Sequence, residues 1–113
     1  MSKKDEKIEQ YSAEAKKLGL GISADLIAKV TTGLGPSIYK KDSETVSCSQ
    51  ASELETVKKN FLQKKLGLAA DDAKFDAAIK KVCEAMGTSN RNKYRALFYA
   101  MLAKEFNKES VYA

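Results

Sequence analysis

The chain contains no histidine and no tryptophan, a single proline and only two cysteines. The absence of histidine removes the commonest general base and the commonest zinc ligand. Two cysteines are too few for a four-ligand zinc site or for a framework of several disulfides. The composition therefore argues against zinc chemistry and against histidine-based catalysis.

The chain also lacks any long apolar stretch. Its longest uninterrupted apolar run, 96–103, is far shorter than the ~20 residues that span a bilayer. The charged start, MSKKDEKIEQ, has no apolar region of the kind found in a secretory signal. Two separate cysteines are typical of a reducing compartment, in which Cys48 and Cys83 would each be a packed or idle thiol. These features predict a cytoplasmic protein that does not associate with membranes.

The spacing of apolar residues predicts helices along nearly the whole chain. With 113 residues, the chain has the size of a single domain, 1–113. No segment shows the alternation of a strand flanked by hairpin turns. We expect an all-α fold, a compact bundle of about five helices that cover 2–18, 23–34, a segment from 49 or 52 to 66, 71–86 and 89–106.

Helix ends are marked by residues with specific capping chemistry. Gly19 and Gly67 each follow a helical pattern and suit the left-handed residue that ends a helix. Side chains placed to cap helix starts are Ser2, Ser23, Ser49 or Ser52, Asp71 and Ser89. The stretch 36–50 has no clear periodicity, and we interpret it as an ordered connection with a short helical turn.

The last expected helix differs from the others because it is apolar or small on every side. Three alanines, at 96, 100 and 103, lie opposite its larger apolar residues. A helix of this kind is usually buried on several sides. We therefore predict that it is the central helix of the bundle.

A short sequence occurs twice. Residues 16–20 and 64–68 both read Lys-Lys-Leu-Gly-Leu, and each copy lies between two expected helices. One interpretation is a pair of similar helical hairpins related by pseudo-symmetry. The alternative is that helix-ending chemistry selects the same residues independently at both places.

Three segments together resemble a small bacterial domain-of-unknown-function family of about this length. They are GLGPSIY at 33–39, ELETVKK at 53–59, and SNRNKYRALFY at 89–99. The resemblance covers nearly the whole chain. It implies a compact helical domain and brings no assigned activity and no functional residues.

A more local resemblance concerns residues 52–86. Their order of apolar residues, with Leu66-Gly67-Leu68 at the centre, is similar to the helical C-terminal domain of the DEK chromatin protein, which binds DNA. The DEK-type pattern favours basic residues at the start of its last helix. This chain has Asp71 and Asp72 there, which argues against DNA binding by that element.

We predict that the protein is not an enzyme and that it has no catalytic residue, cofactor site or metal site. Acidic residues lie mostly at expected helix starts, where the helix dipole accounts for them. Neither cysteine has a histidine to activate it for nucleophilic chemistry. The Thr31–Gly35 run resembles a phosphate-binding loop but lacks its lysine and follows a helix rather than a strand.

The charge of the chain is uneven. Residues 1–56 hold eight lysines and nine acidic residues, whereas 57–113 hold twelve basic and six acidic residues. Paired lysines in the second half are candidates for contacts with phosphate groups: Lys58, Lys59, Lys64 and Lys65. This gives low-specificity nucleic-acid binding as one function. The alternative is that these lysines only make the surface soluble. In that case the aliphatic parts of the Lys58 and Lys65 side chains pack along the apolar face of the expected helix, and their ammonium groups reach the solvent.

Binding to a protein is the function that we favour from the sequence, with a second copy of the chain as one such partner. Tyr39, in the 36–50 connection, is a candidate contact, or else it pins its own loop to the bundle. Arg91 and Arg95 are one helical turn apart, and they either bind a partner's carboxylate or phosphate or cap neighbouring helix ends.

Overall fold

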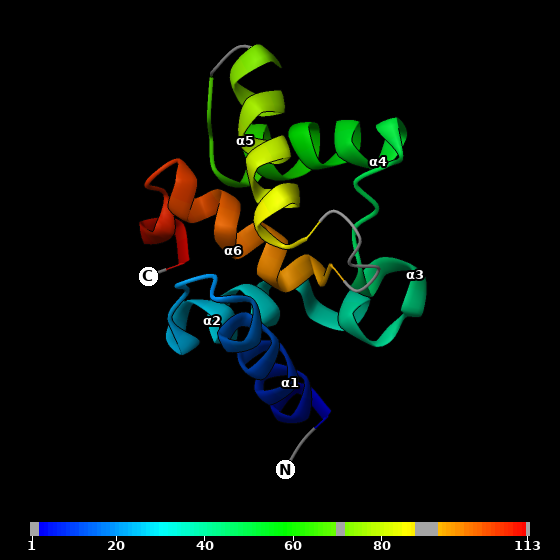
Figure 1. Cartoon of the computed structure of the whole chain (residues 1–113), viewed down its shortest axis with the longest axis vertical. Coiled ribbons are helices and arrows are strands. Elements are labelled where there is room, and N and C mark those ends of the chain that lie inside the picture. The colour runs from blue at the N-terminus through cyan, green and yellow to red at the C-terminus, as the bar shows by residue number, and fades with distance from the viewer. Residues whose placement is uncertain (1–2, 70–71, 88–92, 113) are drawn as a thin grey trace.

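A computed structural model describes residues 3–69, 72–87 and 93–112 (Figure 1). Helix α1, Lys3–Leu18, ends at Gly19, whose φ of 66° is the left-handed conformation that glycine adopts without strain. The Gly19 N–H donates to the Lys16 carbonyl at 3.1 Å, and the Leu20 N–H donates to the Ala15 carbonyl at 3.0 Å. This Schellman arrangement confirms the predicted end of the first helix.

Helix α2, Ala24–Leu34, begins and ends as its sequence predicts. The Ser23 hydroxyl accepts a hydrogen bond from the Leu26 N–H at 3.1 Å, so that Ser23 is the N-cap. Gly35, with a φ of 65°, follows the last residue of the helix. The buried face packs against α1 and α6 through Leu26, Ile27, Val30 and Thr31.

The connection after α2 is ordered and contains two short helices. They are the 3₁₀ helix η1, Gly35–Tyr39, and α3, Lys41–Glu44. Ile38 and Val46 bury their side chains in the core at either end of this segment. The Val46 N–H donates to the Lys93 carbonyl at 2.8 Å, which joins the segment to the start of the last helix. The predicted ordered connection with a helical turn is confirmed.

The third long helix starts without a side-chain cap. It begins as α4, Ala51–Thr56, and its N-cap is Gln50, whose side chain makes no capping hydrogen bond. The expectation that Ser49 or Ser52 caps this helix is wrong. The Ser49 hydroxyl lies 3.2 Å from that of Ser47, and Ser52 already lies inside the first turn.

The same helix then changes its winding. Residues Val57–Lys65 form a π-helix, η2, and the Leu66 N–H continues the pattern by donating to the Phe61 carbonyl five residues earlier. A π-helix has more residues in each turn than an α-helix, so residues four and five apart share a face. The buried residues recur at those intervals, because Val57 is followed by Phe61 and Leu62 and then by Leu66.

The last two long helices are α5, Asp72–Ala85, and α6, Arg95–Glu105. The N-cap of α6 is Tyr94, so the last helix begins five residues later than the sequence predicts from Ser89. The chain closes with the 3₁₀ helix η3, Glu109–Tyr112. The expected caps Ser2, Asp71 and Ser89 lie outside the described residues.

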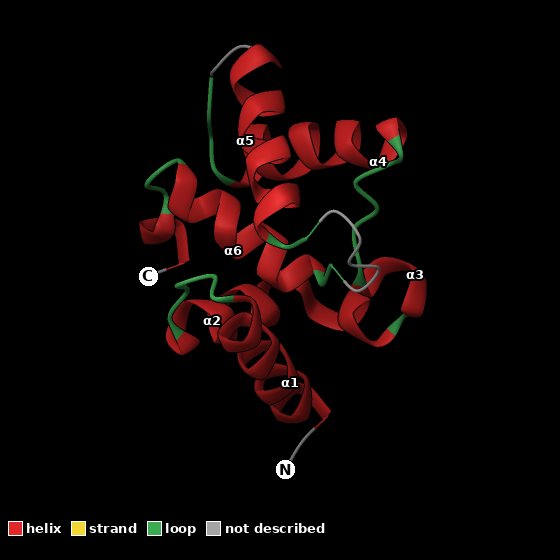
Figure 2. Ribbon diagram, in the orientation of Figure 1, coloured by secondary structure: helices red, strands yellow, loops and turns green. Residues whose placement is uncertain are grey.

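Helix α6 is the centre of the bundle. It runs between the α1–α2 pair and the α4–α5 pair (Figure 1), and it packs against α1, α2, α3 and α5. Figure 2 shows helices and loops and no strand among the described residues. The buried residues of α6 are Ala96, Leu97, Phe98, Tyr99, Ala100, Leu102 and Ala103. The predicted all-α bundle with a central last helix is confirmed. None of the described helices is long and apolar enough to cross a membrane.

Aromatic pairs join α6 and the residue that follows it to the second half of the core. The Phe61 ring of η2 stacks on the Tyr99 ring with the centroids 4.0 Å apart. The Phe75 ring of α5 meets Phe106 edge-on, with the centroids 6.0 Å apart. Both geometries are favourable for aromatic rings and add to the energy of burial.

A disulfide joins Cys48 to Cys83. The expectation of two separate thiols is therefore wrong. The segment before α4 lies against the last turn of α5, and this brings the two Cα atoms within 6.2 Å although 35 residues separate them in sequence. Helical periodicity carries no information about this approach, because it depends on how two elements pack.

The two Lys-Leu-Gly-Leu copies share a conformation but end helices of different kinds. Gly19 and Gly67 have φ values of 66° and 65°. The first ends an α-helix, whereas the second follows the π-helix η2, and there the Leu68 N–H reaches back six residues to the Leu62 carbonyl. The two copies therefore have in common the glycine that ends each helix. This favours the alternative in which helix-ending chemistry selects the same residues at both places, without repeated hairpins.

Replacing Gly19 or Gly67 by alanine should destabilise the fold through backbone strain alone. Nothing lies within 4 Å of a Cβ added at either position, so the left-handed φ is the only cost, about 1 kcal/mol in the free energy of unfolding. Gly33→Ala is the matched control. Its φ is not left-handed and its added Cβ would make an ordinary 3.6 Å contact with Tyr112, so we expect a gain of about 0.5 kcal/mol. Urea unfolding monitored by circular dichroism measures all three; equal effects of the three changes would contradict this assignment.

Candidate functional site

The Arg95 guanidinium, in the first turn of α6, joins three elements of the structure. Its Nε donates to the Ser43 carbonyl at 2.7 Å, and its Nη1 donates to the Tyr99 hydroxyl at 2.9 Å. Its Nη2 donates to the Glu53 carboxylate of α4 and, at 3.5 Å, to the Thr45 carbonyl. One side chain therefore binds α3, α4 and α6 together.

These contacts offset two unfavourable features of the position of Arg95. A cation at the N-terminus of a helix opposes the helix dipole, and its side chain is only 12% exposed. Burial alone would lower the pKa of the guanidinium, but the interactions with Tyr99 and Glu53 outweigh it and raise the pKa. Arg95 stays charged and its charge is neutralised inside the protein.

Of the two functions that the sequence leaves open for Arg95, the structure shows the capping one. The Ser43 and Thr45 carbonyls lie at the end of α3, where a short helix leaves its carbonyls without partners. Arg91, the other member of the predicted pair, lies outside the described residues.

A second set of polar contacts holds α3 against α1. The Glu44 carboxylate accepts a hydrogen bond from the Tyr11 hydroxyl at 2.7 Å and pairs with the Lys7 ammonium group at 2.6 Å. Burial is the largest cause that raises the pKa of Tyr11, and the bond to Glu44 adds to it. Tyr11 therefore remains a neutral donor. The C-terminal end of α3 is fixed twice, through the Glu44 side chain and through the two carbonyls that Arg95 binds.

Tyr39 lies beside this cluster and is the most exposed large apolar side chain among the described residues, at 47%. Tyr39 is the last residue of η1, which packs against α3, the helix that carries Glu44. Tyr94 packs on Tyr11 with the ring centroids 4.8 Å apart and accepts a hydrogen bond from Gln10 at 2.8 Å. We call Tyr39 together with the exposed and half-buried side chains of the contacts described above the Tyr39 surface; its members are Lys7, Gln10, Tyr39, Glu44 and Tyr94.

Tyr39 does not pin its loop, which was the other interpretation of this residue. The neighbouring Ile38 is 2% exposed and does so instead. The loop is therefore anchored through one side chain and presents the next one to solvent.

Lys58 does not lie on a free basic face. Although it is a lysine, it is buried, and its ammonium group lies 2.8 Å from Asp76 and 3.2 Å from Glu55. The hydrogen bond to Asp76 is the largest cause that raises its pKa. Its charge is therefore neutralised by α5 and α4, and it joins these elements rather than facing a ligand.

The other three predicted lysines are exposed. Lys59 and Lys64 are five residues apart, so the π-winding of η2 places them on one face. Neither forms an ion pair with a described acidic residue. The Lys65 ammonium group lies 5.2 Å from the centre of the Tyr112 ring, which is the geometry of a cation–π contact.

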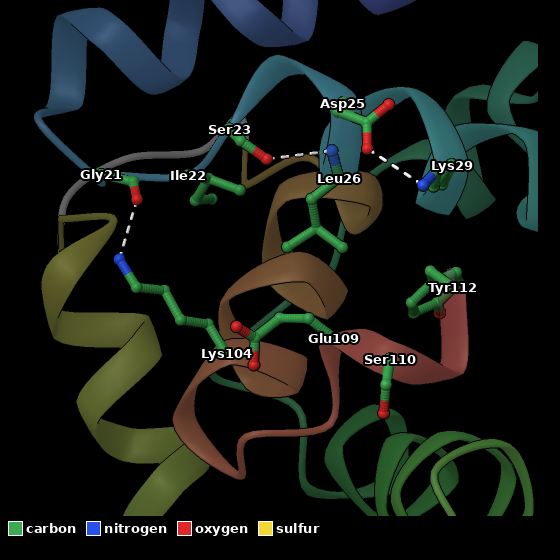
Figure 3. Close-up of a pocket in the computed structure, with 10 residues that line it drawn as sticks. All are labelled: Gly21, Ile22, Ser23, Asp25, Leu26, Lys29, Lys104, Glu109, Ser110 and Tyr112. Carbon is green, nitrogen blue, oxygen red and sulfur yellow. Dashed lines mark hydrogen bonds and ion pairs between the residues drawn. The ribbon is translucent and has the colours of Figure 1, made fainter.

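A pocket of about 400 Å³ lies between the start of α2 and the C-terminal turn η3 (Figure 3). The Lys104 ammonium group crosses its edge and donates to the Gly21 carbonyl at 2.8 Å, and Lys29 pairs with Asp25 at 3.0 Å. With Glu109, the lining holds two positive and two negative charges. Both ammonium groups therefore have partners inside the protein, and the pocket has no net charge to select an ion.

The sequence prediction missed Glu53, Glu44 and the Cys48–Cys83 pair. Glu53 and Glu44 look like ordinary exposed acidic residues in a helical pattern. The sequence does hold a signal for a partner such as Glu53, since an arginine at the start of a buried helix requires an acceptor for its hydrogen bonds. Nothing in the linear pattern pairs Cys48 with Cys83. Among the described residues, no group of three or more His, Cys, Asp or Glu side chains is placed to hold a metal ion.

The fold and these contacts define a small all-α protein whose polar side chains clamp its own helices together. The chain belongs to the family of proteins of unknown function DUF2853, whose model matches residues 10–110. The predicted membership of a domain-of-unknown-function family is confirmed at that level. No curated protein matches the chain.

Arg95→Met should destabilise the protein strongly. The change leaves the Glu53 carboxylate and two carbonyls without their donor. Because the ion pair is only partly buried, its loss should cost more than that of a surface pair and less than that of a buried one, about 2 kcal/mol. Lys81→Met is the control, because Lys81 pairs with Glu105 at an exposed position and the loss should stay below about 1 kcal/mol. Denaturant unfolding compares the two. A cost for Arg95→Met no larger than for Lys81→Met would show that Arg95 does not organise the fold.

Proposed function

We propose that this protein acts by binding another protein through the Tyr39 surface, and that it is not an enzyme. The observation that carries the proposal is an exposed tyrosine on a segment that the protein holds rigid. Tyrosine is among the residues that contribute most to protein interfaces, because its ring is apolar and its hydroxyl is polar.

The rigidity of the segment supports binding. Ile38 and Val46 are buried on either side of α3, Glu44 is bound by Tyr11 and Lys7, and Arg95 holds the end of α3. A surface that is already ordered loses little conformational entropy when a partner binds. The same contacts that shape the fold therefore lower the cost of binding at Tyr39.

The composition of the surface favours a protein over a small molecule. Besides Tyr39, the Tyr39 surface holds one amide, one basic and one acidic side chain and a second tyrosine. Mixed polar groups around an aromatic side chain are typical of the exposed surfaces that proteins use to bind each other. The cytoplasmic location expected from the sequence rested in part on separate thiols, and the proposal does not depend on it.

Photo-crosslinking from position 39 tests this proposal. A photoreactive phenylalanine analogue replaces Tyr39 in the full chain, and the same analogue replaces Val111 as control, since Val111 is the other exposed large apolar residue, at 37%. We expect a defined protein adduct from position 39 and none from position 111, either to a second copy or to another protein from the source cells. An excess of the unlabelled native chain should compete with the labelled chain and suppress the adduct. The Tyr39→Ser chain should no longer compete, although its free energy of unfolding is not lowered. Equal labelling from both positions, or none from position 39, would contradict the proposal.

A second candidate is nucleic-acid binding by the exposed face of η2, favoured by the placement of Lys59 and Lys64 on one face with no ion pair to a described acidic residue. The resemblance of residues 52–86 to the DEK domain stays a prediction. Compared with the sequence-based set, the candidate contacts lose Lys58, because Glu55 and Asp76 neutralise it.

Fluorescence anisotropy with labelled duplex DNA tests the second candidate. Two phosphate contacts give a slope of about −2 for log K against log salt concentration. The double change Lys59→Glu with Lys64→Glu should abolish binding. The control is Lys16→Glu with Lys17→Glu, an exposed lysine pair of α1 that alters net charge equally. If both double variants weaken binding alike, the effect is one of net charge and the η2 face is not a site.

A further inference from the structure

The Cys48–Cys83 disulfide is the covalent attachment of a ten-residue segment that buries none of its side chains. From Ser47 to Thr56, between the buried Val46 and the buried Val57, no side chain is buried. The segment includes α4, which has no buried residue and no side-chain cap. Helix α4 continues directly into η2, and the Val57 N–H donates to the Glu53 and Leu54 carbonyls. Its C-terminal end is therefore held by η2, and its first turn depends on contacts with the rest of the protein.

Three other attachments act on this segment. Leu54 is partly buried against the core, the Glu53 carboxylate binds Arg95, and the Glu55 carboxylate pairs with Lys58. The Glu53 and Glu55 side chains are 26% and 49% exposed, so both ion pairs are open to water. Of the four attachments, the disulfide is the only covalent one, and it is the one that a change of redox conditions removes.

The two ends of the segment are fixed independently of the disulfide. On one side the Val46 N–H binds the Lys93 carbonyl, and Thr45 forms a bridge with Tyr94. On the other side Val57 is fully buried in the core together with Phe61 and Leu62. Opening between these points therefore need not disturb the core, because the chain on both sides stays in place.

We propose that Cys48–Cys83 is a site of reversible thiol–disulfide exchange, and that its reduction releases residues 47–56 from the body of the protein. The reactant is a thiol of low molecular weight, of the glutathione class. Cys48 is partly exposed and Cys83 is almost buried, so the incoming thiolate reaches the Cys48 sulfur.

The exchange balances in two steps. The thiolate attacks the Cys48 Sγ, forms a mixed disulfide with it and breaks the bond to Cys83, which leaves as a thiolate and takes up a proton. A second thiol then attacks the mixed disulfide and releases Cys48 as a thiol. Two thiol molecules become one oxidised disulfide molecule, and the protein disulfide gains two electrons and two protons. The oxidised small disulfide drives the reverse reaction.

The position of Cys83 suits a disulfide that holds a segment in place better than one that catalyses disulfide exchange in other proteins. Oxidoreductases activate a cysteine at the N-terminus of a helix, where the dipole lowers the thiol pKa. Cys83 lies in the last turn of α5, at the end of the helix that opposes a thiolate. The pair therefore responds to its redox surroundings and does not pass electrons on to other proteins.

Amide hydrogen exchange followed by mass spectrometry tests the proposal on the full chain, with and without dithiothreitol. After reduction, we expect exchange within 47–56 to become roughly 100-fold faster, while exchange within the buried part of α6 stays unchanged. Exchange that does not change in 47–56 after complete reduction would overturn the proposal. Faster exchange throughout the chain would also overturn it, because the disulfide would then stabilise the whole fold and not this segment. A disulfide that dithiothreitol does not reduce in the native protein would overturn it as well.

Two variants test whether the disulfide itself holds residues 47–56 in place. The double variant Cys48→Ser with Cys83→Ser should show fast exchange in 47–56 both with and without dithiothreitol. Glu53→Gln weakens one of the two polar attachments, the one to Arg95, so it should have a small effect in the oxidised protein and a larger one after reduction. If Glu53→Gln opens the segment equally in both states, the disulfide does not hold it.

Discussion

The arrangement of this protein depends on one partly buried charge, the Arg95 guanidinium. It lies at the start of the central helix, where the helix dipole disfavours a cation, and it is stable there because Glu53, Tyr99 and two carbonyls of the preceding segment accept its hydrogen bonds. Those carbonyls belong to residues 43 and 45, more than fifty positions from Tyr99 in sequence. One side chain thus decides where α3 and α4 lie relative to α6.

The proposed binding surface follows from that constraint. A segment of this kind, with two short helices and several polar residues, has too little apolar surface to hold itself in place. Arg95 and the Tyr11–Glu44 contact both fix the C-terminal end of α3, while Ile38, in η1 before it, is buried in the core. Tyr39 is left exposed as a result. The exposed aromatic ring is therefore a product of the way the segment is anchored.

The parts of the fold that could be predicted from the sequence are those set by local chemistry. Gly19 and Ser23 end and begin their helices as predicted, because a helix end has few ways to satisfy its backbone groups. The burial of the last helix followed from its apolar composition. What could not be predicted depends on how elements pack. The Cys48–Cys83 bond and the contacts of Arg95 need two distant segments to meet, and the π-winding from Val57 serves a buried face that only the assembled core defines.

The charged residues illustrate the same limit for function. Lys58 and Arg95 both looked like candidates for binding an outside partner, and both neutralise acidic side chains within the protein. Composition gives the number of charges on a chain, but only the fold shows which of them are already paired.

The most direct test of this account is the backbone mobility of residues 38–46 in the native protein and in Arg95→Lys, measured by nitrogen-15 relaxation. Lysine keeps the charge but cannot reach several acceptors at once. The account predicts order parameters of about 0.85 in the native segment, as in rigid backbone, and a fall below about 0.6 in the variant, with α6 unchanged. A segment that stays equally rigid in Arg95→Lys would show that Arg95 does not hold it, and the link between the partly buried charge and the Tyr39 surface would be wrong.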